Sequence, residues 1–202
     1  MKGIDSIKVY EELDRVTREI HLSGLVDFSE CTIDFLTDYI INIHHHYLRK
    51  ALPQLQDHIN RFADGHRKKF EYLDEVQRIV NHLSQYMTSH LQEEEDVIFP
   101  YIRQIAHAYS AEEAYASLLV RTLRKPVEDI MHHEHNTLFK SMQRLRELTS
   151  NYKVPENSCI SHGVTFNKIR EVDNDLAQHM HLENDILFPK AIAMEKELLR
   201  RR

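Results

Sequence analysis

The sequence predicts an all-α fold: an antiparallel four-helix bundle built of two similar helical hairpins and preceded by a short N-terminal helical arm. Three observations support this prediction. The 202 residues include only four Gly and five Pro, which leaves few places for tight turns or helix breaks. Apolar residues recur at three- and four-residue spacing over four long stretches. Finally, a motif in the second stretch returns in the fourth.

The elements are expected in the following order. Residues 1–31 should form the arm and a linker, with helical periodicity over about residues 5–22. The four-helix bundle should occupy residues 32–200, with a short connecting helix over 111–124. Breaks are expected near residues 63–65, 100–110 and 151–163, and Pro100 and Pro189 should act as helix terminators.

Each of the four long helices should bury one stripe of residues. In the first helix the stripe is Ile41, His45, Leu48, Leu52, Leu55 and Ile59. In the second it is Val76, Val80, Leu83, Met87, His90, Glu94, Val97 and Tyr101. The third helix is entered at Pro126 and carries Val127, Met131, His135, Leu138, Met142 and Leu145. The stripe of the fourth is Ile169, Val172, Leu176, His179, Glu183 and Ile186.

The internal repeat combines a His-x-x-x-Glu motif with a Phe-Pro dipeptide. It occurs at His90, Glu94, Phe99 and Pro100, and again at His179, Glu183, Phe188 and Pro189. His45 and His135 occupy matching places on the two preceding helices. The chain therefore consists of two hairpins of the same plan, which should pack about a pseudo-twofold axis.

Residues four apart project from the same face of a helix, so both His-x-x-x-Glu pairs point into the expected core. A buried carboxylate is costly unless it is paired or binds a metal. The candidate metal ligands are His45, His90, Glu94, His135, His179 and Glu183. These four imidazoles and two carboxylates are enough for two metal ions that share both Glu, and a donor set without thiolate suits iron, manganese or zinc.

Charge and cysteine content exclude several function classes. The formal charge is −6, and basic residues are dispersed except at the C-terminal end, so no nucleic-acid partner is expected. No apolar stretch has the length of a signal peptide core or a membrane span, which predicts a cytoplasmic protein with no membrane partner. Cys31 and Cys159 are too few and too far apart for a disulfide framework or a cysteine-built zinc site.

These motifs, together with His45-x-x-Leu48-Arg49 and Glu134-His135, resemble the hemerythrin-type HHE cation-binding domain. Within that family the chain is most similar to the bacterial repair-of-iron-centres proteins, and the resemblance covers about residues 32–195. It implies a hemerythrin-like bundle with an oxo- or hydroxo-bridged pair of Fe ions. The implied ligands of one iron are His45 and His90 and those of the other are His135 and His179, with Glu94 and Glu183 as bridges.

The resemblance also implies a function. Proteins of this kind take part in the repair of iron–sulfur clusters after nitrosative or oxidative damage. The implied partners are nitric oxide, oxygen and damaged iron–sulfur proteins, and iron is favoured over manganese or zinc. The bridging carboxylates would hold the iron pair through a change of oxidation state, while an open position binds a gas or iron is passed to a client.

Two departures from the family pattern keep alternatives open. The oxygen carriers have a further His where Phe139 stands and a carboxylate where Asn184 stands, so oxygen carriage is the weaker interpretation. The repair proteins carry an N-terminal Cys-Cys domain, which this sequence lacks. The alternative is therefore a non-enzymatic oxygen or nitric-oxide sensor or an iron-storage module, and a bundle with merely structural core His comes third. The sequence leaves open whether the chain is an enzyme and whether it forms a homodimer.

Most other polar residues are expected to be structural or solvated. In the acidic run 93–96 only Glu94 is in register with the core. His44 is expected either to support the site or simply to pack, whereas His162 and five further histidines should lie at the surface. Glu134 either guards a channel to the metals or forms a surface ion pair.

Overall fold

The computed structural model describes residues 27–111 and 127–200, and for residues 127–136 only the backbone. The chain divides into two units, Met1–Cys31 and Thr32–Arg202. The described part of the first unit contains one 3-10 turn, η2 (Phe28–Glu30). The Asp27 carboxylate caps this turn by accepting a hydrogen bond from the Ser29 amide. The helices predicted over residues 5–22 and 111–124 lie outside the described residues.

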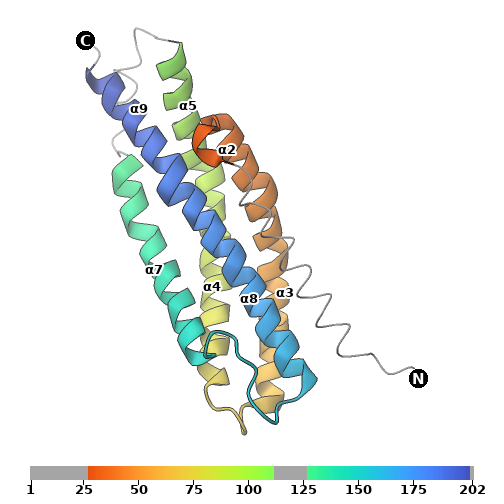
Figure 1. The fold of residues 1–202 in the computed structure, drawn as a ribbon. Helices are drawn as coiled ribbons and strands as arrows, with labels where there is room; N and C mark the ends of the chain where they lie inside the picture. The colour runs from red at the N-terminus through yellow and green to blue at the C-terminus, as the bar shows by residue number, and fades with distance from the viewer. Residues whose placement is uncertain (1–26, 112–126, 201–202) are drawn as a thin grey trace. The chain divides into compact units, whose positions relative to one another are not determined.

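Four long helical segments make up the described part of the second unit (Figure 1). The first runs through α2 (Ile33–Tyr39), η3 (Ile40–His45) and α3 (His46–His66). The second runs through α4 (Leu73–Glu93), η4 (Glu94–Ile98) and α5 (Phe99–Ser110), and the third is α7 (Val127–Leu148). The fourth comprises α8 (Ile160–His181), η5 (Leu182–Leu187) and α9 (Phe188–Arg200).

The segments pack as a helical bundle around one apolar core. Helix α3 packs against both α4 and α8, while α7 packs against α4 and α9. The core includes most of the predicted stripe residues, with Leu48, Ile59, Val76, Met87 and Leu176 fully buried. Ile41 was predicted in the core but is only partly buried, and the preceding Ile40 is buried instead. The side chains of Val127, Met131 and His135 lie outside the described residues. These observations confirm the all-α, hemerythrin-like bundle. Among the described residues, no helix is long and apolar enough to cross a membrane.

The first two long segments each have a recognisable helix-start signal. The Thr32 hydroxyl accepts a hydrogen bond from the Phe35 amide and so caps the first turn of α2. Asp74 and Glu75 stand in the first turn of α4, where negative charge interacts favourably with the positive end of the helix dipole. Both features favour helices that begin at these positions.

Within residues 27–111 and 127–200, three segments of the bundle are π-helical, and they change which residues are buried. Sequence periodicity predicted Val97 and Ile186 in the core, but Val97 is 58% exposed and Ile186 only partly buried. The next residues, Ile98 and Leu187, are buried instead. A π turn takes one more residue than an α turn. The buried stripe therefore moves by one position where η4 and η5 interrupt the α-helices.

Pro100 and Pro189 do not terminate their helices, so this prediction is wrong. Each follows a π segment and stands at the second residue of a further helix, α5 or α9. Proline is tolerated in a first helical turn because its missing N–H has no partner to lose there. Each proline stands in the first turn of the α-helix that follows a π segment. The chain therefore continues as α5 or α9 for about three turns beyond the Phe-Pro dipeptide.

A buried ionic network joins α7 to α8 beside their connection. The guanidinium of Arg146 donates two hydrogen bonds to the Asp173 carboxylate at 2.6 and 2.8 Å, and the Tyr152 hydroxyl donates a third at 2.8 Å. Asp173 is only 3% exposed. Tyr152 and the preceding Ser150 and Asn151 have positive φ angles of 62°, 49° and 57°, a region that L-residues rarely adopt. The network therefore holds a costly turn in place.

Replacing Asp173 with Ala should lower the free energy of unfolding by about 2–3 kcal/mol, because Arg146 and Tyr152 lose a shared buried acceptor. Because Arg146 is partly exposed, the expected loss of unfolding free energy is smaller than for an ion pair in which both partners are buried. Urea denaturation checks this value. The exposed Asp64, changed to Ala in the last turn of α3, should alter stability by less than about 0.5 kcal/mol. Equal losses in the two variants would contradict the proposed role of the network.

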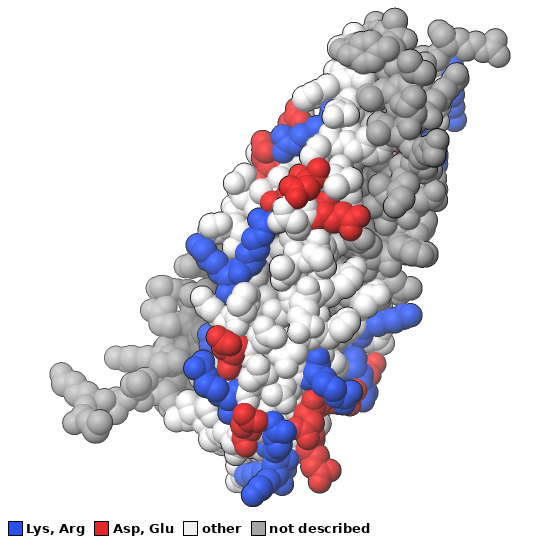
Figure 2. All heavy atoms as spheres, turned by 180° about the vertical axis from the view of Figure 1, so that it is seen from behind, with Lys and Arg blue, Asp and Glu red and all other residues white. Residues whose placement is uncertain are grey.

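One surface prediction is also wrong. His162 is fully buried, and its ring lies against Phe62, Phe70 and Phe166 while Tyr72 shares a hydrogen bond with its Nε2 at 2.9 Å. Phe166 lies one turn further along α8, but Phe62, Phe70 and Tyr72 come from α3 and the connection to α4, so the helical period of α8 alone could not reveal them. Figure 2 shows one outer face of the protein, on which small acidic and basic groups are interspersed with uncharged surface.

Candidate metal centre

Three helical segments bring predicted ligands into the core at the same level, and each does so at a π segment. His45 is the last residue of η3 and Glu94 is the first residue of η4. His179 lies in the last turn of α8, and Glu183 follows in η5. Single π turns within α-helices occur frequently at functional sites because they redirect side chains. The local irregularity of the bundle therefore coincides with its polar residues.

The four residues form one tight cluster. Ligand atoms of His45, Glu94, His179 and Glu183 all lie within 4.8 Å of one another, and all four side chains are fully buried. The Nε2 atoms of His45 and His179 share a hydrogen bond of 3.1 Å. Two imidazoles and two carboxylates at 0% exposure are an expensive arrangement for a core unless they bind a cation.

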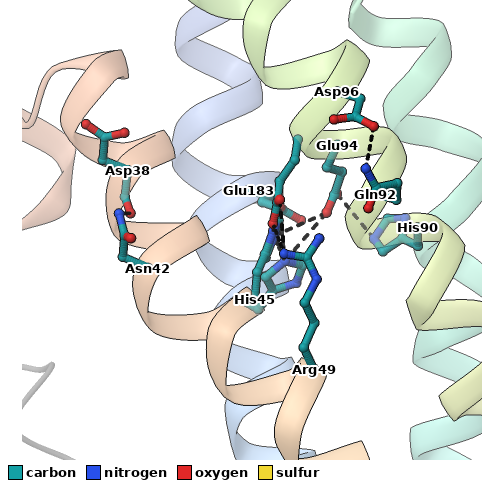
Figure 3. A network of polar contacts seen from close by, with 11 residues as sticks. Asp38, Asn42, His45, Arg49, His90, Gln92, Glu94, Asp96 and Glu183 are labelled. Atoms are coloured by element: carbon teal, nitrogen blue, oxygen red, sulfur yellow. Dashed lines mark hydrogen bonds and ion pairs between the residues drawn. The ribbon is translucent and has the colours of Figure 1, made fainter.

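Glu94 connects the cluster to a further histidine. Its Oε1 atom lies 3.2 Å from Nε2 of His90, one helical turn away, and its Oε2 atom lies 3.4 Å from Nε2 of His45 (Figure 3). The same Oε2 atom is 3.8 Å from Nε2 of His179. Glu183 makes the matching intrahelical contact, with Oε1 at 3.3 Å from Nε2 of His179. One carboxylate thus faces imidazoles from three helices, as a bridging ligand must.

The structure therefore brings five of the six predicted ligands together: His45, His90, Glu94, His179 and Glu183. The sixth, His135, belongs to α7, but its side chain lies outside the described part of the structure, as does that of Glu134. Its role as a ligand remains a prediction.

Burial sets the protonation state that the cluster needs. Burial lowers the pKa of His179 well below its usual range, and the attraction of Glu94 opposes this shift without cancelling it. His179 is therefore neutral at pH 7, and only a neutral imidazole can ligate a metal. Aromatic rings limit access on two sides, since Phe99 stacks on His45 and Tyr86 stacks on His90, both at 5.6 Å between ring centroids.

Two carboxylates beside the cluster were not predicted. Glu95 was expected in solvent, yet its side chain is only 19% exposed and its Oε1 lies 2.8 Å from Nδ1 of His45. Asp175 lies 3.0 Å from Nδ1 of the buried His44, and burial raises the pKa of this carboxyl. The ring of His44 also lies edge-on to that of His179, with 6.1 Å between the ring centroids, so His44 stands beside the cluster. No pattern in the sequence pointed to Glu95 or Asp175, because each contacts a histidine of another helical segment.

A second group of titratable side chains lies at the other end of the bundle. Cys159 precedes the first residue of α8, with its sulfur 2.9 Å from the Ser161 hydroxyl and 3.1 Å from Nε2 of His66. The Ser161 hydroxyl, the His162 amide and His66 lower the pKa of this thiol to about 7. Helix α3 separates His66 from His45 by about 30 Å, at 1.5 Å per residue, so this group is no part of the cluster.

The donor set fits a metal of borderline character. Imidazole and carboxylate without thiolate suit iron, manganese or zinc, and a carboxylate that faces several histidines, as Glu94 does, can bridge two ions. The fold and the cluster together define a helical bundle with a candidate metal site in its core. Residues 37–191 match the family model of the hemerythrin HHE cation-binding domain. The chain belongs to this family.

The chain is also similar to individual proteins of known name. The chain is 30% identical over 173 residues to the iron-sulfur cluster repair protein YtfE of Pectobacterium atrosepticum, covering 84% of this chain and 70% of the relative. It is 26% identical over 191 residues to YtfE of Citrobacter koseri, covering 92% and 80%. The iron-sulfur cluster repair protein ScdA of Staphylococcus epidermidis is 23% identical over 158 residues, covering 78% and 66%. The chain is thus a hemerythrin-like metal-binding protein related to iron-sulfur cluster repair proteins.

Proposed function

We propose that this protein binds two iron ions and acts in the repair of iron–sulfur clusters damaged by nitrosative or oxidative stress. The proposed ligands are His45, His90, Glu94, His135, His179 and Glu183. The observation that carries the proposal is the buried cluster of four ligand groups within 4.8 Å, in a bundle whose relatives bear the name of repair proteins. The proposed partners are nitric oxide, oxygen and damaged iron–sulfur proteins.

In such a centre the glutamates and the histidines would have different roles. Glu94 and Glu183 each offer two oxygens, which allows them to bridge two ions and to balance their charge. The histidines supply neutral donors from separate helices, and the apolar core around them excludes bulk water. When bound, an iron pair supplies one-electron redox chemistry and a position for nitric oxide or oxygen. Rigid helices then keep the ligand positions fixed between oxidation states.

A reconstitution assay tests the repair function. A purified hydratase with an iron–sulfur cluster is inactivated with nitric oxide and incubated anaerobically with the iron-loaded protein and a thiol reductant. We expect recovery of hydratase activity at least tenfold faster with wild-type protein than with free ferrous iron at the same concentration. Glu183→Ala should give no more recovery than free iron, because it removes a proposed bridge. A wild-type rate equal to that of free iron would contradict the repair function.

The alternative function is non-enzymatic: a sensor of oxygen or nitric oxide, or an iron-storage module. The same site geometry supports it, since bridging carboxylates and neutral imidazoles hold iron without any client protein. The assay separates the two functions. Full iron loading combined with no recovery of the damaged hydratase would favour the alternative.

A further inference from the structure

The imidazole of His45 lies between two consecutive glutamates, one near each of its ring nitrogens. On one side, Oε2 of Glu94 lies 3.4 Å from Nε2, and on the other, Oε1 of Glu95 lies 2.8 Å from Nδ1. In an α-helix, neighbouring residues point about 100° apart, and here both belong to the π segment η4. The two ring nitrogens of His45 therefore have different neighbours: Nε2 faces Glu94 of the cluster, and Nδ1 faces Glu95.

The contact with Glu95 specifies where the ring proton lies. A carboxylate can only accept, so Nδ1 of His45 must donate its N–H to Glu95. In the tautomer with its single ring proton on Nδ1, the unprotonated Nε2 of His45 lies 3.1 Å from Nε2 of His179 and 3.4 Å from Oε2 of Glu94. In the metal-free protein, Nε2 of His179 must then donate the hydrogen bond of 3.1 Å to His45. One tautomer assignment follows from the other.

Arg49 holds Glu95 in this position. Its guanidinium contacts Oε1 of Glu95 at 2.9 Å and Oε2 at 3.0 Å. Arg49 extends from the same helix as His45, one turn further on, toward the acidic residues of η4 (Figure 3). Both contacts come from one nitrogen, Nη1, which lies between the two carboxylate oxygens. The arginine of the His-x-x-Leu-Arg motif thus acquires a role that the sequence left unassigned.

We propose that Glu95, anchored by Arg49, is a positioning residue that fixes His45 with its proton on Nδ1 and its Nε2 open to a metal ion. The inference rests on the proposed metal centre and deepens it, because it says how one ligand is prepared before metal arrives. Carboxylates that accept from the outer nitrogen of a metal-binding histidine typically change metal affinity by 10- to 100-fold. Glu95 is not itself a ligand, since its oxygens contact Nδ1 and Arg49.

Nitrogen-15 NMR of the histidine rings tests the proposal without any metal. In metal-free wild-type protein, His45 should show a protonated Nδ1 and a bare Nε2, and His179 should show the reverse. Glu95→Ala should shift His45 toward the Nε2-protonated form, whereas Glu95→Gln should keep the wild-type pattern because its amide oxygen still accepts. Asp96→Ala is the matched control, since Asp96 is the next acidic residue and contacts Gln92 instead. An unchanged His45 pattern in Glu95→Ala would overturn the proposal.

Chelator competition with ferrous iron provides the second measurement. We expect Glu95→Ala to weaken iron binding by about 10- to 100-fold, with Glu95→Gln and Asp96→Ala within about threefold of wild type. If Glu95→Ala fails to fold, Arg49→Ala serves in its place, because Arg49 is 43% exposed and its loss releases Glu95. Equal affinity of wild type and Glu95→Ala would refute the positioning role alone. A wild-type protein that binds no iron would refute the metal centre, and the tautomer result would still stand.

Discussion

Alanine at Glu94 or Glu183 is expected to reduce iron uptake from about two ions per chain to fewer than one. Glu94 faces His45, His90 and His179, so its removal takes away the one group that contacts all three. Two ions held close together also repel each other, and bridging carboxylates offset that repulsion. Loss of either bridge should therefore destabilise both iron positions rather than one. Anaerobic iron titration followed by elemental analysis of the desalted protein measures the effect.

Glu195→Gln is the matched control for these variants. Glu195 is also a buried glutamate on the fourth helical segment, but it accepts a hydrogen bond of 2.5 Å from the Tyr101 hydroxyl, and that contact helps to raise the pKa of Tyr101. A variant that merely disturbs packing between α5 and α9 should retain about two ions. Uptake that is unchanged in both Glu94→Ala and Glu183→Ala would show that the cluster is not the iron site.

Metal removal is expected to lower the melting temperature by about 10 °C. A ligand at roughly a thousand times its Kd stabilises a folded protein by about 4 kcal/mol, and each kcal/mol shifts Tm by about 2–4 °C in a domain of this size. The buried carboxylates add to the difference, because without a cation they repel each other inside the core. Differential scanning calorimetry of the iron-loaded and chelator-treated protein measures the shift.

A variant that is expected to raise the melting temperature of the metal-free protein tests whether repulsion between buried carboxylates destabilises it. Glu94→Met replaces a fully buried carboxylate with an apolar side chain of similar size. Such replacements are often neutral or stabilising when the charge has no cation to bind. The metal-free variant should therefore melt at or above the temperature of the metal-free wild type, while its stability no longer responds to iron. A metal-free variant that melts well below the wild type would mean that Glu94 serves the fold itself.

The fold could be predicted from the sequence because helical periodicity and the scarcity of Gly and Pro act locally. The same reasoning misplaced Val97 and Ile186, since a period measured along an α-helix cannot anticipate a π turn. It also read Pro100 as a terminator, although the chain resumes a helix at the preceding residue. These errors have one cause: the sequence shows which residues can share a helical face but not where the helix changes its winding.

The candidate site was predictable to the extent that it is periodic. His45, Glu94, His179 and Glu183 stand on repeating core positions, and the structure places all four in one cluster. Glu95 escaped prediction because it follows another acid in a run that is usually solvated, and its partner, Nδ1 of His45, lies 50 residues away. Residues that orient a ligand from a neighbouring helix leave no periodic signal.

Iron stoichiometry combined with the Mössbauer spectrum of the loaded protein tests the central claim most directly. The protein is titrated anaerobically with isotopically enriched ferrous iron, desalted, oxidised and measured. A bridged pair predicts about two iron ions per chain and a diamagnetic ground state from two coupled ferric ions, with both features lost in Glu94→Ala and Glu183→Ala. Fewer than one bound ion, or a paramagnetic signal from isolated ferric iron that persists in both variants, would contradict a di-iron centre in this bundle.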